Sequence, residues 1–182
     1  EVTAKLTPPY SLFSDKDYKG LQDRSNELSE INQQRPLTPD EISEQESIEQ
    51  ERFKWLEYFK IKFKADWYTR IVGKLVLRTN IEFGFLASYN SDVGAVPFER
   101  FFMGGDGLGG NFTLDGRETI QLRGYENNSI TPINPITGQQ EGGIVFNKYS
   151  LELRYPLTLK PSASIYALTF LEAGNNFNNF QE

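Results

Sequence analysis

Period-two alternation is the sequence feature that most limits what this chain can fold into. Polar and apolar residues alternate along four stretches, at 2–6, 60–70, 74–89 and 147–155. Successive side chains of a β-strand point to opposite faces, so each stretch predicts a strand with one polar and one apolar face. The clearest stretch, 74–89, sets one face of Lys74, Arg78, Asn80, Glu82 and Ser88 against another of Leu75, Leu77, Ile81, Phe83 and Phe85.

A fifth stretch, 162–173, is apolar on both faces until Glu172. Its aromatic and β-branched residues, with a short turn expected at Pro156 to Pro161, favour a strand here as well. The fold class predicted from the five stretches is therefore all-β with antiparallel strands.

Two all-β architectures give this alternation: a soluble sandwich with one hydrated face, and a transmembrane barrel. The closely spaced charges of the polar faces favour the barrel, whose lumen is filled with water. Aromatic residues at the ends of the apolar faces (Trp67, Tyr68, Tyr89 and Tyr155) are typical of interfacial girdles. The expected connections also alternate, long at 14–50 and 91–143 but short near 67–73 and 156–161, as barrel loops and turns do.

Composition excludes several kinds of chemistry. The 182 residues include no Cys and no His, which removes thiol nucleophiles, disulfides, imidazole bases and zinc sites built on either residue. Residues 105–110 have the spacing of a dinucleotide-binding loop but lack the surrounding βαβ unit. Glu152 and Glu172 could pair as acid and base, but no nucleophile accompanies them. We expect no catalytic residue, no metal and no cofactor, and hence no enzyme.

Negative charge is concentrated in one segment. The chain carries a net charge of −6, and residues 15–51 alone hold eleven acidic and four basic residues. Because a nucleic-acid site needs a basic face, no nucleic-acid partner is expected. Within this segment Thr38, Pro39 and Glu41 form a helix-start pattern, which predicts a short acidic helix from about Pro39 inside a long loop.

Four blocks of sequence carry a family resemblance. They are Phe98-Glu99-Arg100-Phe101-Phe102-Met103-Gly104-Gly105, Leu122-Arg123-Gly124-Tyr125-Glu126-Asn127, Leu151-Glu152-Leu153-Arg154-Tyr155-Pro156 and Phe170-Leu171-Glu172-Ala173-Gly174-Asn175. In this order they resemble the C-terminal barrel of the BamA family of outer-membrane assembly factors. The second block contains the (V/L)RG(F/Y) signature of that transporter and insertase superfamily. The resemblance is close from 98 to about 176, whereas residues 1–90 share only the strand pattern.

The resemblance implies a transmembrane barrel of sixteen strands preceded by periplasmic POTRA domains. The chain would supply about five of these strands, on either side of the sixth extracellular loop, and we expect it to be a fragment of a longer protein. The segments that follow are a strand at 1–13, an acidic extracellular loop with a short helix at 14–50, two strands at 51–90, a long loop at 91–143, two strands at 144–173 and the start of the next loop at 174–182.

The implied function is to fold nascent outer-membrane proteins and insert them into the bilayer of the cell outer membrane. The implied partners are those nascent proteins, outer-membrane lipid and lipopolysaccharide, and accessory assembly lipoproteins. The implied mechanism is β-augmentation at a seam whose strands lie outside this chain. A related two-partner secretion or TamA-like translocation barrel, and an unrelated outer-membrane channel, are the alternatives.

The resemblance also implies a lumen latch in the loop that carries the signature. The loop folds back into the barrel, and Arg123 meets the carboxylates of Glu152 and Glu172. A guanidinium that loses hydration needs such partners, and its fork suits carboxylates. Gly124 would let the backbone turn tightly, and Tyr125 would wedge the loop against the barrel wall.

Overall fold

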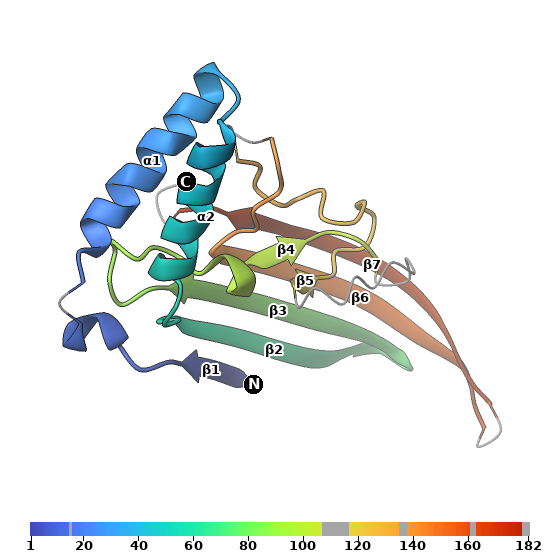
Figure 1. The fold of residues 1–182 in the computed structure, drawn as a ribbon. Helices are drawn as coiled ribbons and strands as arrows, with labels where there is room; N and C mark the ends of the chain where they lie inside the picture. Colours follow the sequence, from blue (N-terminus) through green and yellow to red (C-terminus); the bar gives the residue numbers. More distant parts are fainter. Residues whose placement is uncertain (15, 107–116, 135–137, 161–162, 180–182) are drawn as a thin grey trace.

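Five strands form one antiparallel sheet, as the alternation predicts. The computed structural model describes residues 1–14, 16–106, 117–134, 138–160 and 163–179. The strands β1 (Val2–Leu6), β2 (Phe59–Val72), β3 (Leu75–Ala87), β6 (Val145–Lys160) and β7 (Ala163–Phe177) pair in the order β1-β2-β3-β6-β7. Among the described residues this sheet is open, with β1 and β7 at its edges (Figure 1).

The expectation of a single short helix in the first loop is wrong. Two helices follow the short 3-10 helix η1 (Tyr10–Phe13): α1 (Tyr18–Gln34) and α2 (Pro39–Arg52). The pattern at Thr38 does begin α2, with a capping box formed between Thr38 and Glu41. Helix α1 was missed because it begins without a Thr-Pro start pattern like that of α2, although Asp17 caps it by accepting from the Gly20 N–H. Neither described helix is long and apolar enough to cross a membrane.

Strand register places the charged residues on one face of the sheet. Lys64 lies opposite Glu82, and Arg78 lies opposite Glu152 on the next strand. Directly paired residues share a face, so we call this the inner face and the apolar side the outer face. Tyr68 pairs with Arg78 and therefore lies on the inner face, so its expected place among the outward girdle aromatics is wrong.

Three strands, β2, β6 and β7, are longer than predicted, and the short turns are tighter. The first hairpin turns at Gly73 and Lys74, where Gly73 adopts φ +56°. Pro156 lies within β6 rather than in a turn, next to a register shift between positions 156 and 158. A bulge tolerates a proline because the ladder hydrogen bond is already interrupted there. At the other end β7 continues to Phe177, so the expected start of a loop at 174 is wrong.

The segment between β3 and β6 folds back over the inner face (Figure 1). It contains η2 (Pro97–Glu99) and the short parallel pair β4 (Phe101–Met103) and β5 (Glu118–Ile120). We call the sheet end next to the long connections the loop side, and the end with the two short hairpin turns the turn side. The apolar residues of the segment close a core against the loop-side ends of β3 and β6. The buried members are Tyr58, Leu86, Val96, Phe101, Met103, Ile120, Leu122, Ile144 and Phe146.

The outer face carries exposed aromatic residues towards both ends. At the loop side the ring of Phe59 lies 5.5 Å from that of Phe85 and 5.3 Å from that of Tyr89. At the turn side Trp67 and Tyr155 are exposed. Phe59 and Trp67 are roughly 26 Å apart along β2 at about 3.3 Å per residue. This spacing is comparable with the apolar band of about 25 Å on outer-membrane barrels.

Candidate functional site

Arg123 joins the inward-folded loop to two neighbouring strands. Its Nη2 donates to Oε1 of Glu152 at 2.5 Å and to Oε1 of Glu172 at 2.6 Å, and its Nε donates to the latter oxygen at 3.0 Å. Both carboxylates are almost fully buried, Glu152 on β6 and Glu172 on β7. The structure therefore brings together the three charged residues predicted for the latch.

Further contacts fix the loop backbone at this point. The Arg123 N–H donates to Oε2 of Glu172 at 2.8 Å, so both oxygens of that carboxylate are occupied by one residue. The guanidinium also lies 3.9 Å from the ring centroid of Phe170, a cation–π contact. Gly124 follows with φ +91°, a conformation that favours glycine and turns the chain away from the sheet.

The expectation that Tyr125 wedges the loop against the wall is wrong. Its side chain is 46% exposed, and its backbone carbonyl, not its ring, accepts a hydrogen bond from the Gly105 N–H at 3.1 Å. Tyr125 thus ties one part of the loop to another. At this point of the loop the contact with the sheet is made by the charged side chain of Arg123.

The latch is part of a larger charge network on the inner face. Oε2 of Glu152 also accepts from the guanidinium of Arg154 and lies 3.3 Å from Nη1 of Arg78. Arg78 in turn donates from Nη2 to Oδ1 of Asp66 at 2.6 Å. The ion-paired members of this network among the described residues are Asp66, Arg78, Arg123, Glu152, Arg154 and Glu172.

Formal charges cancel in this network, since three guanidinium groups meet three carboxylates. This balance of charge matters because an ion left without its partner in a buried site lowers stability by about 3–5 kcal/mol. The alternation of the sequence had placed Arg78 and Arg154 on the polar face. It could not show that both converge on Glu152, because that depends on strand register.

A second cluster, which the sequence reasoning missed, anchors the start of the same loop. Lys60 of β2 is 1% exposed, and its ammonium group has three partners. It donates to the Glu99 carbonyl oxygen at 2.7 Å and lies 3.1 Å from Oε2 of Glu99 and 2.6 Å from Oε2 of Glu118. Three partners match the three donors of a lysine ammonium. The ring of Phe101 covers the same nitrogen at 4.5 Å.

The neighbouring residues reinforce this second cluster. Lys62 Nζ lies 2.6 Å from Oε1 of Glu118, and the Tyr58 hydroxyl donates to Oε1 of Glu99 at 2.9 Å. Burial alone would raise the pKa of Glu99, but hydrogen bonds from Lys60 and Tyr58 outweigh it and hold the pKa below the ordinary value. For Glu118 burial likewise raises the pKa, and the hydrogen bonds from Lys60 and Lys62 lower it further than burial raises it.

The two clusters have opposite polarity. In the first, the loop supplies a cation and the strands supply carboxylates; in the second, the loop supplies carboxylates and the strands supply lysines. Like charges in close contact repel, so exchanging the two ends of the loop is unfavourable. The loop is thereby fixed in position and in direction.

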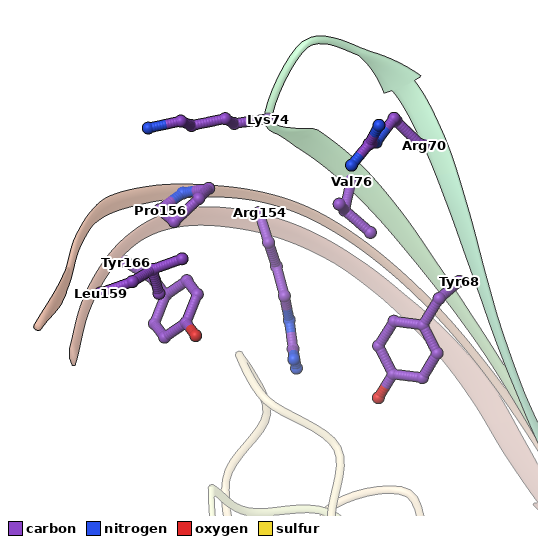
Figure 2. Close-up of a pocket in the computed structure, with 8 residues that line it drawn as sticks. All are labelled: Tyr68, Arg70, Lys74, Val76, Arg154, Pro156, Leu159 and Tyr166. Atoms are coloured by element: carbon purple, nitrogen blue, oxygen red, sulfur yellow. The ribbon is translucent and has the colours of Figure 1, made fainter. Parts of the chain in front are cut away.

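Beyond the latch, the inner face is hollowed at the turn side. A cavity of about 410 Å³ is lined by residues of both hairpins, including Tyr68, Arg70, Arg154, Pro156 and Tyr166. Figure 2 shows the side chain of Arg154 between the two tyrosines, extending towards the tip of a loop. Arg154 therefore lies at the boundary between the charge network and this open region.

Two further expectations from the sequence concern a metal site and nucleotide binding by the glycine-rich stretch. The described residues contain no group of three or more His, Cys, Asp and Glu side chains that could hold a metal ion. Of the glycine-rich stretch 105–110, positions 107–110 lie outside the described residues.

Comparison with known proteins gives one finding. Residues 45–182 match the Omp85 superfamily domain. No curated protein matches the chain at a significant level.

Proposed function

Because the chain belongs to the Omp85 superfamily, whose members are outer-membrane β-barrels, we propose that it forms part of a BamA-type assembly barrel. Such a barrel folds nascent outer-membrane proteins and inserts them into the bilayer. The five-stranded sheet supplies part of its wall, with the inner face towards the lumen and the outer face towards lipid.

The observation that carries this proposal is the position of Arg123. A signature arginine reaches from the inward-folded loop to carboxylates on two adjacent strands, 2.5 Å from Glu152 and 2.6 Å from Glu172. A loop held in this way braces β6 and β7 against each other and occupies the lumen beside them. We assign Arg123, Glu152 and Glu172 the role of a latch, with Gly124 supplying its turn.

Insertion itself proceeds through β-augmentation, in which an unpaired strand edge offers its backbone groups to the incoming strand. The seam strands lie outside this chain, so no residue here pairs with substrate. Nascent outer-membrane proteins, outer-membrane lipid and lipopolysaccharide, and accessory assembly lipoproteins are the proposed partners, and no cofactor takes part.

A translocation barrel of the two-partner secretion or TamA-like kind is the second candidate. It is favoured by the same superfamily match, because that match covers insertion and translocation barrels alike. Membership of the superfamily argues against the remaining alternative, an unrelated channel.

The test uses the full-length protein that contains this chain, reconstituted in lipid vesicles. An unfolded outer-membrane protein is added, and its folding is followed by the shift in gel mobility between folded and heated samples. An assembly barrel accelerates folding over empty vesicles. Export of a secreted partner without acceleration of folding identifies a translocation barrel instead, and ion conductance without either activity contradicts both.

A further inference from the structure

We propose that the residues around η1 form a lipid-contacting pad at the loop-side edge of the barrel, seated at the boundary between acyl chains and headgroups. The pad consists of Tyr10, Leu12, Phe13 and Trp55. This inference rests on the proposed function, because it requires the outer face of the sheet to face lipid.

The pad is made of large apolar side chains that lie exposed. A 3-10 helix has three residues per turn, so Tyr10 and Phe13 of η1 lie on one side of it. The ring of Tyr10 packs against that of Trp55, with 5.3 Å between centroids. Nevertheless Leu12, Phe13 and Trp55 are 76%, 86% and 57% exposed. Water is a poor environment for so much exposed apolar surface.

A buried carboxylate holds η1 on the outer side of the sheet. Tyr58 points inward, because its hydroxyl donates to Glu99 of the inward-folded loop. The preceding residue, Glu57, therefore points outward, in phase with Phe59. Glu57 is 1% exposed and accepts from the N–H and the hydroxyl of Ser11, at 2.7 and 2.8 Å. These two hydrogen bonds fix η1 over the outer end of β2.

The pad continues the outer-face aromatic residues by one layer. The next outward position of β2 is Phe59, whose ring contacts those of Phe85 and Tyr89. Tyrosine and tryptophan, which combine an apolar ring with one polar group, are the residues enriched at membrane interfaces. The pad provides one of each, at Tyr10 and Trp55, directly beyond this aromatic cluster.

The boundary with water follows within a few residues. Beyond Phe13 the chain enters α1 and α2, whose charged residues form exposed ion pairs such as Arg24 with Glu44. Lipid is therefore the occupant that fits the pad, which has apolar wall on one side and hydrated helices on the other. Figure 1 shows η1 beside the loop-side end of β1, at the base of the two helices.

Site-directed spin labelling of the full-length protein tests this proposal. Phe13→Cys is made in a cysteine-free background, labelled with a nitroxide and reconstituted in vesicles of phosphatidylethanolamine and phosphatidylglycerol. Oxygen concentrates in the bilayer and a nickel chelate stays in water, so the ratio of their collision rates reports the surroundings of the label. Phe63→Cys, on the outer face of β2, is the lipid control. Ile42→Cys, at a residue 46% exposed on α2, is the water control.

The expected result is an oxygen-to-nickel ratio at position 13 several-fold above that at position 42 and close to that at position 63. A ratio equal to that at position 42 means that water covers the pad, and protection from both reagents means that protein covers it. Either result overturns the inference alone. If position 63 also reports water, the lipid-facing orientation in the proposed function has failed as well.

Discussion

At the scale of single residues, we expect Arg123 to have the largest effect on the docking of the loop. A guanidinium group brought out of bulk water requires compensating carboxylates in fixed positions, and Arg123 has Glu152 and Glu172 on adjacent strands. Its removal leaves two buried carboxylates close together without their shared cation. Glu152 still has Arg78 and Arg154 beside it, so the unpaired charge falls on Glu172, which must then take up a proton or admit water.

Arg123→Ala is therefore expected to weaken docking of the loop by about 3 kcal/mol, the cost of breaking a buried pair. Arg123→Lys restores only part of it, because an ammonium cannot bridge two carboxylates with the fork geometry of a guanidinium. Limited proteolysis of the loop in the full-length protein measures the effect. Arg70→Ala, at an exposed arginine of β2, is the control and leaves the cleavage rate unchanged. Equal cleavage of both alanine variants would contradict the latch.

The second cluster predicts a dependence on pH. The pKa values of Glu99 and Glu118 lie below the ordinary carboxyl value in the folded protein. A carboxylate with a lowered pKa stabilises the folded state fully above its unfolded pKa, and this contribution disappears as the pH falls through the folded pKa. The start of the loop should thus loosen in acid, below about pH 4, where ordinary carboxyl groups take up protons.

A nitroxide at Phe98→Cys, beside Glu99, reports this loosening as increased mobility during an acid titration. The double variant Glu99→Gln, Glu118→Gln removes both titrating groups, so its label should be mobile already at neutral pH and change little in acid. A wild-type label whose mobility is constant across the titration would show that these carboxylates do not hold the loop.

At the scale of elements, the two faces of a strand should respond oppositely to charge. Leu151→Arg on the outer face of β6 is expected to cost about 2–4 kcal/mol of barrel stability near mid-bilayer, and Phe83→Arg about the same. Ser150, the inner-face neighbour of Leu151, is not a suitable control, because Ser150 is buried and donates to Glu172, so arginine does not fit there. Tyr166→Arg, on the exposed inner face of β7, is the better control. Denaturant titration in vesicles should show a clear loss of stability for Leu151→Arg and little for Tyr166→Arg; equal losses would refute the assigned faces.

The helices α1 and α2 should be dispensable for barrel assembly. Leu28 and Ile48 are buried in the helical pair, and Arg24 and Glu44 join the two helices on its surface. Deletion of residues 15–50 in the full-length protein, with a short glycine-serine linker in their place, should leave a barrel with normal heat-dependent gel mobility. Absence of the folded form would show that the helices support the sheet. The proposed position of this pair is extracellular.

The sequence predicted the elements whose pattern is local and missed those that depend on distant contacts. Period two placed Arg78 and Glu152 on the polar face because alternation is a property of each strand alone. The pairing of these two residues depends on register between strands, which alternation does not encode. Lys60 could be assigned to the inner face, but its partner Glu118 is 58 positions away in a loop without periodicity. Helix α1 was missed because it has no start pattern like Thr38-Pro39 of α2, and Pro156 was misread because a bulge tolerates proline within a strand.

At the scale of the whole molecule, the inward-folded loop and the sheet depend on each other. The inner face of the sheet is charged, and the loop neutralises it at two places with opposite polarity. Between the two clusters lies an apolar core that includes Phe101, Leu122 and Phe146. The loop is therefore a structural partner of the sheet, and we propose that the latch is the contact that makes an assembly barrel competent.

The role of the Arg123 latch is tested most directly by the rate at which a nascent outer-membrane protein inserts into vesicles that contain the full-length protein. Wild type, Arg123→Ala, Arg123→Lys and Arg70→Ala are compared after each barrel is shown to be folded by its gel mobility. We expect that Arg123→Ala loses most of the acceleration over empty vesicles, that Arg123→Lys retains part of it, and that Arg70→Ala equals wild type. A folded Arg123→Ala barrel that inserts substrate at the wild-type rate would show that insertion does not depend on the latch.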